Sequence, residues 1–314
     1  MPISSFVQLA GHVRNFLGAA KSGCNRVIEI SCCKRYGLGN IDRIKSRPAI
    51  RLDSALTERG YVDSREKAGD LIREGKVLVN GAVASKASRQ VRLGDQIHVT
   101  EMPRFVSRAG LKLEGALRRF ELSVEGLRVL DVGSSTGGFT DCLLQYGAYS
   151  VCAVDVGTNQ LHEKIRNDSR VTSFERMNIR SFNDPQGEGF DLIAVDVSFT
   201  SVRGLAGSLI GLAKPRGKLL VLVKPQFEVG HRDASKGKGV IKDSKLWHDS
   251  LVDVADTFRQ LGATVNGLGV SEVRGTQGNV EFFYYLSKNS ENPGIDLEQA
   301  IEDEIARVSG ESGS

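Results

Sequence analysis

The sequence predicts an α/β protein with two parts: a doubly wound, mostly parallel sheet and, before it, a small α+β module. Three observations support this. From residue 127 onward, short apolar runs alternate with amphipathic runs, as in repeated βα units. A glycine-rich turn follows the first apolar run, and a compact stretch rich in turn residues precedes it, at 51–100. No apolar run approaches the ~18 residues that span a bilayer.

The α+β module is expected to contain two short helices and several short strands. Leu52 and Leu56 lie four residues apart, on one face of the first helix. Asp63 and Ser64 are candidate N-caps for the second helix. Asn80-Gly81, between apolar residues, is the strongest short sequence pattern for a β-hairpin.

The larger part is expected to form a Rossmann-like sheet, in which ligands bind beyond the carboxyl ends of the strands. An amphipathic helix carrying Leu113 and Leu117 comes first. Strands are expected at 128–132, 151–155, 171–175, 191–197, 218–224, 264–270 and 280–286. Helices are expected between most of them, at 138–147, 158–167, 201–213 and 245–261.

Composition divides the chain into an extension at 1–48, the module at 49–102, the sheet domain at 103–290 and an acidic tail at 291–314. Residues 1–50 hold eight Lys/Arg against two Asp/Glu, and 291–314 hold one against seven. The extension resembles an organelle-targeting segment; a disordered extension, or a start codon assigned too early, explains it equally well. Otherwise we expect a cytoplasmic protein.

The five cysteines form no C-x-x-C pair, so we expect a reducing compartment, no disulfide and no metal. Composition leaves the oligomeric state open.

The loop after the first strand of the sheet predicts a cofactor site. It is Gly133-Ser-Ser-Thr-Gly137-Gly138, preceded by Asp131, and it lacks the G-x-G-x-x-G pattern of dinucleotide sites. An acid before the loop suits a ligand with a cationic amine, of which S-adenosylmethionine is the common example. The alternative is an ordinary strand–loop–helix corner. The residues expected to hold the cofactor are Asp131, Gly133, Ser134, Thr136, Gly137, Gly138, Asp155 and Asn178.

Two of these residues follow later strands. Asp155 ends the second strand, where a carboxylate can accept both hydroxyls of a ribose. Its alternative role is to cap a helix beginning near Asn159. Asn178 follows the third strand and is expected near the adenine ring.

Four charged residues are candidates for the chemistry. Asp196 ends the fourth strand, Lys224 ends the fifth and Glu281 begins the last, while Lys112 lies on the preceding helix. Strand ends that are distant in sequence can meet in one cleft, where two lysines and two acids would balance in charge. Burial and a second cation make a lysine a better proton acceptor. Taken singly, each residue is more simply a surface charge.

Residues 51–99 resemble the S4 RNA-binding domain, in the form L-D-x-x-L…S-R-x-x-A…I-x-x-G-x-V-x-V-N-G. That family binds structured RNA, chiefly through backbone and shape. The alternative is a basic domain that docks onto its neighbour. The cations expected to contact RNA phosphates are Arg51, Arg65, Lys67, Arg73, Lys76 and Arg89.

The larger part resembles FtsJ-like RNA 2′-O-methyltransferases, whose Lys-Asp-Lys-Glu tetrad Lys112, Asp196, Lys224 and Glu281 match. The resemblance to the TlyA family is narrower and more specific. It lies in an S4 module followed by the motifs V-S-R-A-G-L-K-L, D-V-G-S-S-T-G-G-F-T, D-V-S-F, V-K-P-Q-F-E-V-G and G-N-V-E-F-F. Ala109-Gly110-Leu111 departs from that family's usual Gly-Ala-His, and neither the extension nor the acidic tail is covered.

This resemblance implies cytidine 2′-O-methylation in ribosomal RNA or ribosomal subunits, with Lys224 as the general base and no metal. Two alternatives remain. One is a non-catalytic RNA-binding or ribosome-assembly factor with the same fold. The other is a membrane-active haemolysin, the family's older label, although the sequence contains no persuasive membrane-seeking amphipathic segment.

Overall fold

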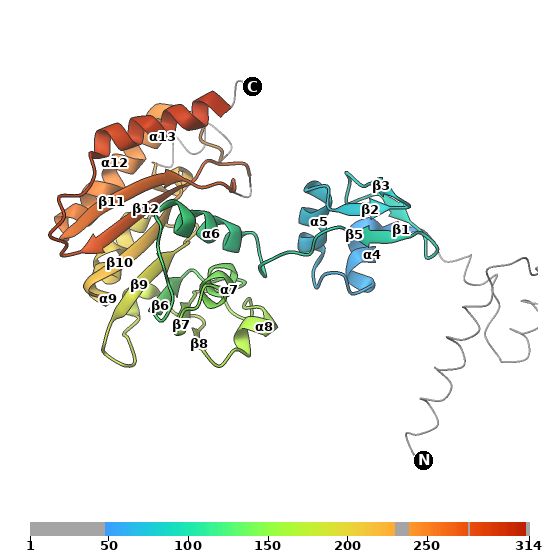
Figure 1. Ribbon diagram of the computed structural model, residues 1–314, viewed down its shortest axis with the longest axis horizontal. Helices are drawn as coiled ribbons and strands as arrows, with labels where there is room; N and C mark the ends of the chain where they lie inside the picture. Colours follow the sequence, from blue (N-terminus) through green and yellow to red (C-terminus); the bar gives the residue numbers. More distant parts are fainter. Residues whose placement is uncertain (1–47, 230–238, 276, 312–314) are drawn as a thin grey trace, which may run out of the picture. The chain divides into compact units, whose positions relative to one another are not determined.

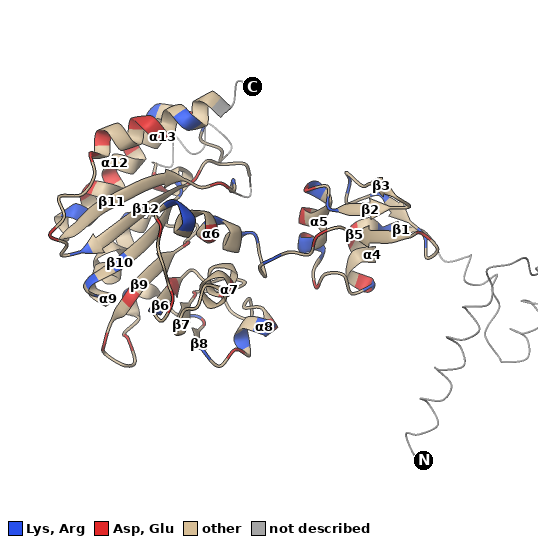
Figure 2. Ribbon diagram, in the orientation of Figure 1, with Lys and Arg blue, Asp and Glu red and all other residues tan. Residues whose placement is uncertain are grey.

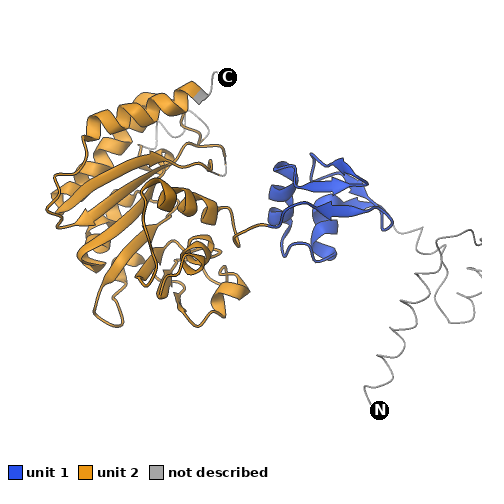
Figure 3. Ribbon diagram, viewed as in Figure 1, with its two compact units in different colours: residues 1–102 blue, residues 103–314 orange. Residues whose placement is uncertain are grey.

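The computed structural model describes residues 48–229, 239–275 and 277–311 of the chain. The chain divides into two compact units, residues 1–102 and 103–314 (Figures 1 and 3). The predicted N-terminal extension, apart from Pro48, lies outside the described residues, and so does its possible targeting role.

The first unit packs two helices against two small antiparallel sheets. Its elements are β1 (Ile50–Arg51), α4 (Leu52–Glu58), α5 (Arg65–Arg73), β2 (Val77–Val79), β3 (Ala82–Val83), β4 (Gln90–Val91) and β5 (Ile97–Val99). β1 pairs with β4, and β2 pairs with both β3 and β5. Ser64 caps α5 as predicted, because its hydroxyl accepts a hydrogen bond from Lys67 N at 3.2 Å. Asn80 and Gly81 turn β2 into β3 with φ of +53° and +83°, as a two-residue hairpin requires.

The second unit is built on a seven-stranded sheet. In spatial order its strands are β11 (Ala263–Val270), β12 (Phe282–Lys288), β10 (Ala213–Val223), β9 (Phe190–Val195), β6 (Arg128–Val132), β7 (Ser150–Val154) and β8 (Val171–Phe174). β12 runs antiparallel to β10 and β11, whereas the pairings among β10, β9, β6, β7 and β8 are parallel. The chain builds outward from β6 to β8, then returns to β9 on the other side of β6. The carboxyl ends of β6 and β9 are therefore the switch point at which such sheets bind ligands.

Helices cover both faces of this sheet (Figure 1). One apolar cluster joins the strands to α6 (Ala109–Arg119), α7 (Gly138–Gln145) and α8 (Glu163–Arg166). The other joins them to η1 (Ile179–Ser181), η2 (Val202–Leu205), α9 (Ala206–Leu212), α12 (Ser244–Gln260) and α13 (Leu297–Glu311). Val129 belongs to the first cluster and its neighbour Leu130 to the second, as expected of a strand buried on both faces.

Two predicted helices are shorter in the structure. The helix expected at 158–167 is formed only from Glu163 to Arg166, because Asn159 is left-handed at φ +54° and the imidazole of His162 caps the helix. The helix expected at 201–213 divides into η2 and α9. Apolar spacing alone did not reveal these interruptions.

The predicted acidic tail is not separate from the sheet domain. Most of it forms α13, which buries Leu297, Ile301 and Val308 against the sheet and α12. Acidic residues are frequent along this helix (Figure 2). The helix also carries an apolar stripe at helical spacing, which its acidic composition does not reveal. Composition alone therefore placed the end of the domain too early.

Candidate active site

The loop between β6 and α7 packs tightly against two other segments of the second unit. Gly133 has φ +83°, and a Cβ at this position would overlap the backbone carbonyl of Asp196. A Cβ at Gly138 would overlap the Ser107 side chain. These glycines therefore let the loop contact both the end of β9 and the segment that leads into α6. Through them, the predicted cofactor loop is joined to the backbones that carry Asp196 and Lys112.

Asp131 lies beneath this loop with its side chain fully buried. Its Oδ2 accepts a hydrogen bond from the Thr140 hydroxyl at 2.6 Å, whereas its Oδ1 has no partner in the described part of the chain. Burial raises the pKa of this carboxyl to about 7, although the Thr140 hydrogen bond opposes the shift. An unpartnered buried acceptor beside the loop fits a ligand that brings a hydrogen-bond donor.

Asp155 directly follows β7 and fixes the same loop from the other side. Its Oδ2 accepts from Ser135 N at 2.8 Å, and its Oδ1 accepts from Gly157 N at 2.6 Å. The alternative reading of Asp155 as a helix cap is wrong, because His162 caps the next helix. A carboxylate oxygen can accept more than one hydrogen bond, so Asp155 can still accept from a ligand.

The remaining predicted cofactor residues differ in burial and in backbone conformation. Ser134 is buried, while Thr136 is exposed on the loop. Gly137 is left-handed at φ +89° and is the N-cap residue that directly precedes α7. The side-chain oxygen of Asn178, Oδ1, accepts from Arg180 N at 3.0 Å, which leaves the side-chain amide nitrogen as its group for a ligand.

The structure brings Lys112, Asp196, Lys224 and Glu281 together at one edge of the sheet. Asp196 and Lys224 directly follow β9 and β10, which are parallel neighbours. Glu281 precedes β12, and because that strand is antiparallel, its beginning lies at the same edge as the end of β10. Lys112 reaches this edge from α6.

The four charges form two close ion pairs. Lys112 Nζ lies 2.5 Å from Glu281 Oε2, and Lys224 Nζ lies 2.5 Å from Asp196 Oδ1. Their side chains are 3–14% exposed. The Lys224–Asp196 contact is an ion pair without hydrogen-bond geometry, since Asp196 Oδ1 has no hydrogen-bond partner among the described residues. Each buried charge is balanced by an opposite one, which reduces the cost of removing it from water.

A cavity of about 720 Å³ lies beside these pairs, and Lys112, Lys224 and Glu281 line it. Ser198 also lines it and accepts a hydrogen bond from Lys224 Nζ at 3.0 Å.

Two aromatic residues in the same lining were not predicted as site residues. Phe199 is 92% exposed with a left-handed φ of +62°, and its ring centroid lies 5.4 Å from that of Phe227. An aromatic residue shortly after a strand-end acid, where solvent-facing residues are normally polar, was the available clue in the sequence.

Comparison with family models identifies this arrangement. The model described as FtsJ-like methyltransferase matches residues 105–288, and the S4 domain model matches residues 50–97. The chain belongs to the FtsJ-like methyltransferase family. The match spans the glycine loop and all four charged residues of the cavity edge.

Individual proteins agree with this assignment. The chain is 41% identical over 239 residues to the 16S/23S rRNA (cytidine-2′-O)-methyltransferase TlyA of Mycobacterium tuberculosis, covering 75% of this chain and 89% of that protein. It is 40% identical over 244 residues to hemolysin A of Brachyspira hyodysenteriae, covering 76% and 99%. A hemolysin-named protein of Streptococcus thermophilus, whose structure is solved, has a TM-score of 0.67 at 37% identity and covers 84% and 97%.

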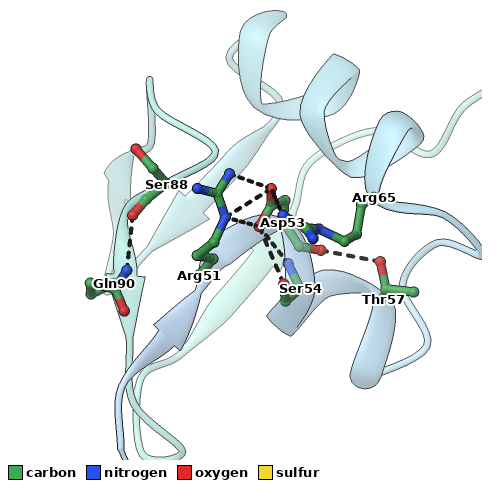
Figure 4. A network of polar contacts seen from close by, with 7 residues as sticks. All are labelled: Arg51, Asp53, Ser54, Thr57, Arg65, Ser88 and Gln90. Carbon is green, nitrogen blue, oxygen red and sulfur yellow. Dashed lines mark hydrogen bonds and ion pairs between the residues drawn. The ribbon is translucent and has the colours of Figure 1, made fainter.

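The S4 domain of this methyltransferase carries the cations predicted to contact RNA. Figure 4 shows Arg51 and Arg65 around one carboxylate, Asp53, at 2.7 Å and 3.1 Å. Hydrogen bonding from Arg51 holds the pKa of Asp53 well below its ordinary value. Asp53 is buried, whereas both arginine side chains are about half exposed. Their guanidinium groups are thus held in place while still facing solvent.

Three more of the predicted cations also have acidic partners within the S4 unit. Lys67 pairs with Asp63 at 2.8 Å, Arg73 with Asp70 at 2.5 Å, and Lys76 with Glu74 and Glu101 at 3.1 Å. Residues 48–102 contain nine Lys/Arg against eight Asp/Glu, so the described S4 unit is nearly neutral. The basic character of the N-terminal third therefore resides mainly in residues 1–47.

Two features are absent from the described residues, a membrane-spanning helix and a metal-binding cluster. Within those ranges no helix is long and apolar enough to cross a membrane. No group of three or more His, Cys, Asp or Glu side chains there has a geometry that could hold a metal ion.

Proposed function

We propose that this protein transfers a methyl group from S-adenosylmethionine to the ribose 2′-oxygen of a cytidine in ribosomal RNA. The observation that carries the proposal is the pair of buried lysine–carboxylate contacts beside a large cavity, in a chain of the FtsJ-like methyltransferase family. The name of the Mycobacterium tuberculosis relative supports the choice of cytidine and of ribosomal RNA.

Lys224, in its uncharged amine form, is the group that accepts the proton of the 2′-hydroxyl. It is buried at the cavity, and Asp196 at 2.5 Å stabilises the ammonium that forms. The hydroxyl of Ser198 helps to hold the lysine in one orientation. Lys112 and Glu281, the second pair, also line the cavity, where they orient the ribose and balance charge.

The loop residues hold the cofactor, which supplies an electrophilic methyl group when bound. The unpartnered Asp131 Oδ1 and the Asp155 carboxylate are the acceptors for its amine and ribose hydroxyls. Contact between Gly133 and the Asp196 backbone sets the distance between the cofactor loop and Lys224. Much of the enzyme's contribution is then positioning for an in-line displacement.

Phe199 and Phe227 suit a nucleotide withdrawn from its stack. A 2′-hydroxyl reaches Lys224 only when the nucleotide enters the cavity, where the exposed ring of Phe199 and the half-buried ring of Phe227 can stack on its base. The S4 domain anchors the surrounding RNA through Arg51, Arg65 and the other exposed cations.

The proposal is tested by incubating the purified full chain with methyl-labelled S-adenosylmethionine and naked ribosomal RNA, small subunits or large subunits. Modified positions are then mapped by partial alkaline hydrolysis, because a 2′-O-methyl group blocks cleavage at its own phosphodiester. We expect label at a cytidine ribose, resistant to cleavage. Label on a base would refute the proposed chemistry.

The same preparation separates the alternatives. A ribosome-assembly factor would bind the subunits without transferring label. A haemolysin would lyse erythrocytes without cofactor, and this activity would survive replacement of Lys224.

A further inference from the structure

Glu228 is a buried carboxylate to which neither the sequence motifs nor the proposed chemistry gives a role. It ends α10 (Pro225–Glu228), the short helix that begins directly after Lys224. Only 7% of the residue is exposed, and burial raises the pKa of its carboxyl above the ordinary value. A carboxylate kept in such a place requires several hydrogen bonds to offset its desolvation.

Those hydrogen bonds come from the segment that follows Asp196. Glu228 Oε2 accepts from the Ser201 hydroxyl at 2.5 Å, and Oε1 accepts from Val202 N at 2.8 Å. Arg203 adds an ion pair at 3.4 Å to Oε2 and a hydrogen bond of 3.0 Å to the Glu228 carbonyl oxygen. One carboxylate thus ties the Lys224 segment to residues 201–203.

These two segments form one wall of the cavity. Ser198, Phe199, Thr200 and Ser201 line it from the β9 side, and Gln226 and Phe227 line it from α10. At their strand-proximal ends the segments are joined by the Lys224–Asp196 ion pair and the Lys224–Ser198 hydrogen bond. At their far ends they are joined by Glu228, so Phe199 and Phe227 lie between two fixed points.

The loop between these points contains a strained backbone conformation, which must be held by contacts with the surrounding structure. Phe199 is left-handed at φ +62°, a backbone conformation that is unfavourable for a residue with a side chain. Such a conformation persists when the surrounding structure over-determines it. Hydrogen bonds at Ser201 and Val202, two and three residues beyond Phe199, provide that restraint.

We propose that Glu228 is a positioning residue for methyl transfer: it fixes the Ser198–Ser201 loop relative to Lys224 and so sets the spacing in which the target nucleotide is held. This inference rests on the proposed function. Glu228 acts through the loop and does not touch the reacting atoms. Its geometry, rather than its charge, carries the effect.

The structure offers a matched control in Glu304. This residue of α13 is also buried, also accepts from a backbone N–H, that of Val270 at 2.8 Å, and also pairs with an arginine, Arg119. Its neighbours belong to α6 and the edge strand β11, and it does not line the cavity. Replacing it removes a similar buried network without touching the cavity wall.

The test compares Glu228→Gln, Glu228→Asp, Glu228→Ala and Glu304→Ala in the full chain, with melting temperature, cofactor affinity, kcat and KM for RNA as readouts. Glu228→Ala and Glu304→Ala should both lower the melting temperature. Only Glu228→Ala should lower kcat, by about tenfold or more, with cofactor affinity unchanged. Glu228→Gln can still accept from Val202 N and donate to Ser201 Oγ, so its kcat should stay within about threefold of the wild type.

Glu228→Asp decides between geometry and charge, and it serves if the alanine variant fails to fold. It retains the carboxylate but is one methylene too short to span the two segments, so its kcat should fall well below that of Glu228→Gln. The proposal is overturned if Asp is tolerated better than Gln, or if Glu304→Ala lowers kcat as much as Glu228→Ala. Wild type and Lys224→Ala in the same assay report on the proposed function itself: if the wild type transfers no methyl group, that function fails, whatever the Glu228 variants show.

Discussion

The Arg51–Asp53 pair of the S4 unit and the Lys112–Glu281 pair of the sheet unit span very different distances in the chain. In the S4 unit, Arg51 pairs with Asp53 two residues away, and the arginine is 44% exposed. In the sheet unit, Lys112 pairs with Glu281 across 169 residues, and both side chains are almost fully buried. The first pair can form from local chain geometry alone, and water screens its charges. The second exists only when the whole sheet is assembled.

This difference predicts where substitutions act. Exposed local pairs contribute little to stability and leave the cation available to a polyanion, so they influence RNA affinity. Removing one partner of a buried pair leaves an uncompensated charge, and the two long-range pairs lie beside the cavity, so their loss should influence catalysis. Four substitutions test this distinction between local and long-range pairs, in order of decreasing expected effect.

Replacing Lys224 with Ala should produce the largest effect. The variant loses the proposed proton acceptor and leaves Asp196 without its counter-charge, so methyl transfer should fall by about 10²–10⁴-fold. Cofactor affinity, measured by calorimetry, should change little. Lys214→Ala is the control, because Lys214 pairs with Asp191 at 2.8 Å away from the cavity lining. Equal losses in the two variants would mean that the loss of any acid-paired lysine of the sheet unit, rather than of the lysine at the cavity, explains the effect.

Gly133→Ala tests whether the cofactor loop and the Asp196 strand end must touch. Both Gly133 and Gly126 are left-handed, so alanine at either costs about 1–2 kcal/mol in backbone strain. A Cβ at Gly133 also overlaps the Asp196 carbonyl, whereas at Gly126 it meets nothing within 4 Å. We expect Gly133→Ala to lower both melting temperature and activity, the latter about tenfold, and Gly126→Ala to lower melting temperature alone. Similar activities for the two variants would mean that the contact between the cofactor loop and the Asp196 backbone is not needed for methyl transfer.

The Asp184–Arg128 pair of the sheet unit should make stability depend on acid pH. Hydrogen bonding from Arg128 lowers the pKa of Asp184 to about 2, from an ordinary value of 3.8. A lowered folded-state pKa gives stability that is present above about pH 4 and lost as pH falls towards 2. Asp184→Asn should therefore lower the free energy of unfolding by roughly 1–2 kcal/mol near neutral pH and flatten the acid limb of the curve.

Asp168 is the matched comparison for Asp184. Its pKa is also lowered to about 2, but through Arg170, whose side chain is 43% exposed, whereas Arg128 is 13% exposed. Asp168→Asn should cost less, because water screens the pair. Chemical denaturation at a series of pH values measures both, and a larger loss for Asp168→Asn would contradict the proposed dependence on burial.

Arg51→Ala should give the smallest effect, a change in RNA affinity, while Arg65 remains paired with Asp53. Loss of one phosphate-contacting cation should raise the dissociation constant for ribosomal RNA several-fold and reduce the slope of its salt dependence by about one. Arg170→Ala is the control: it also breaks a pair with an aspartate two residues away, at nearly the same exposure, but in the sheet unit. An unchanged salt slope for Arg51→Ala would remove Arg51 from the RNA interface.

Local sequence patterns predicted the local features of the fold correctly. Ser64 caps α5, and Asn80-Gly81 forms the hairpin turn, because each depends on backbone preferences within a few residues. The alternation of apolar runs gave the strands of the sheet for the same reason. The prediction was wrong where a contact distant in sequence determines the structure. The segment 291–314 was expected to be a separate tail, but the apolar stripe of α13 packs against β11 and α12.

The sequence by itself determined which charged residues stand at strand ends, since strand ends are marked by the change from apolar to polar residues. It did not determine how they pair. Only the tertiary structure joined Lys112 to Glu281 and Lys224 to Asp196, because the antiparallel entry of β12 brings its first residues to the carboxyl edge of β9 and β10. It also determined the contacts of Phe199 and Glu228. Phe199 follows β9 and packs on Phe227, while Glu228 follows β10 and accepts hydrogen bonds from residues that follow β9. Contacts of this kind depend on strand order, which short-range patterns of hydrophobicity do not encode.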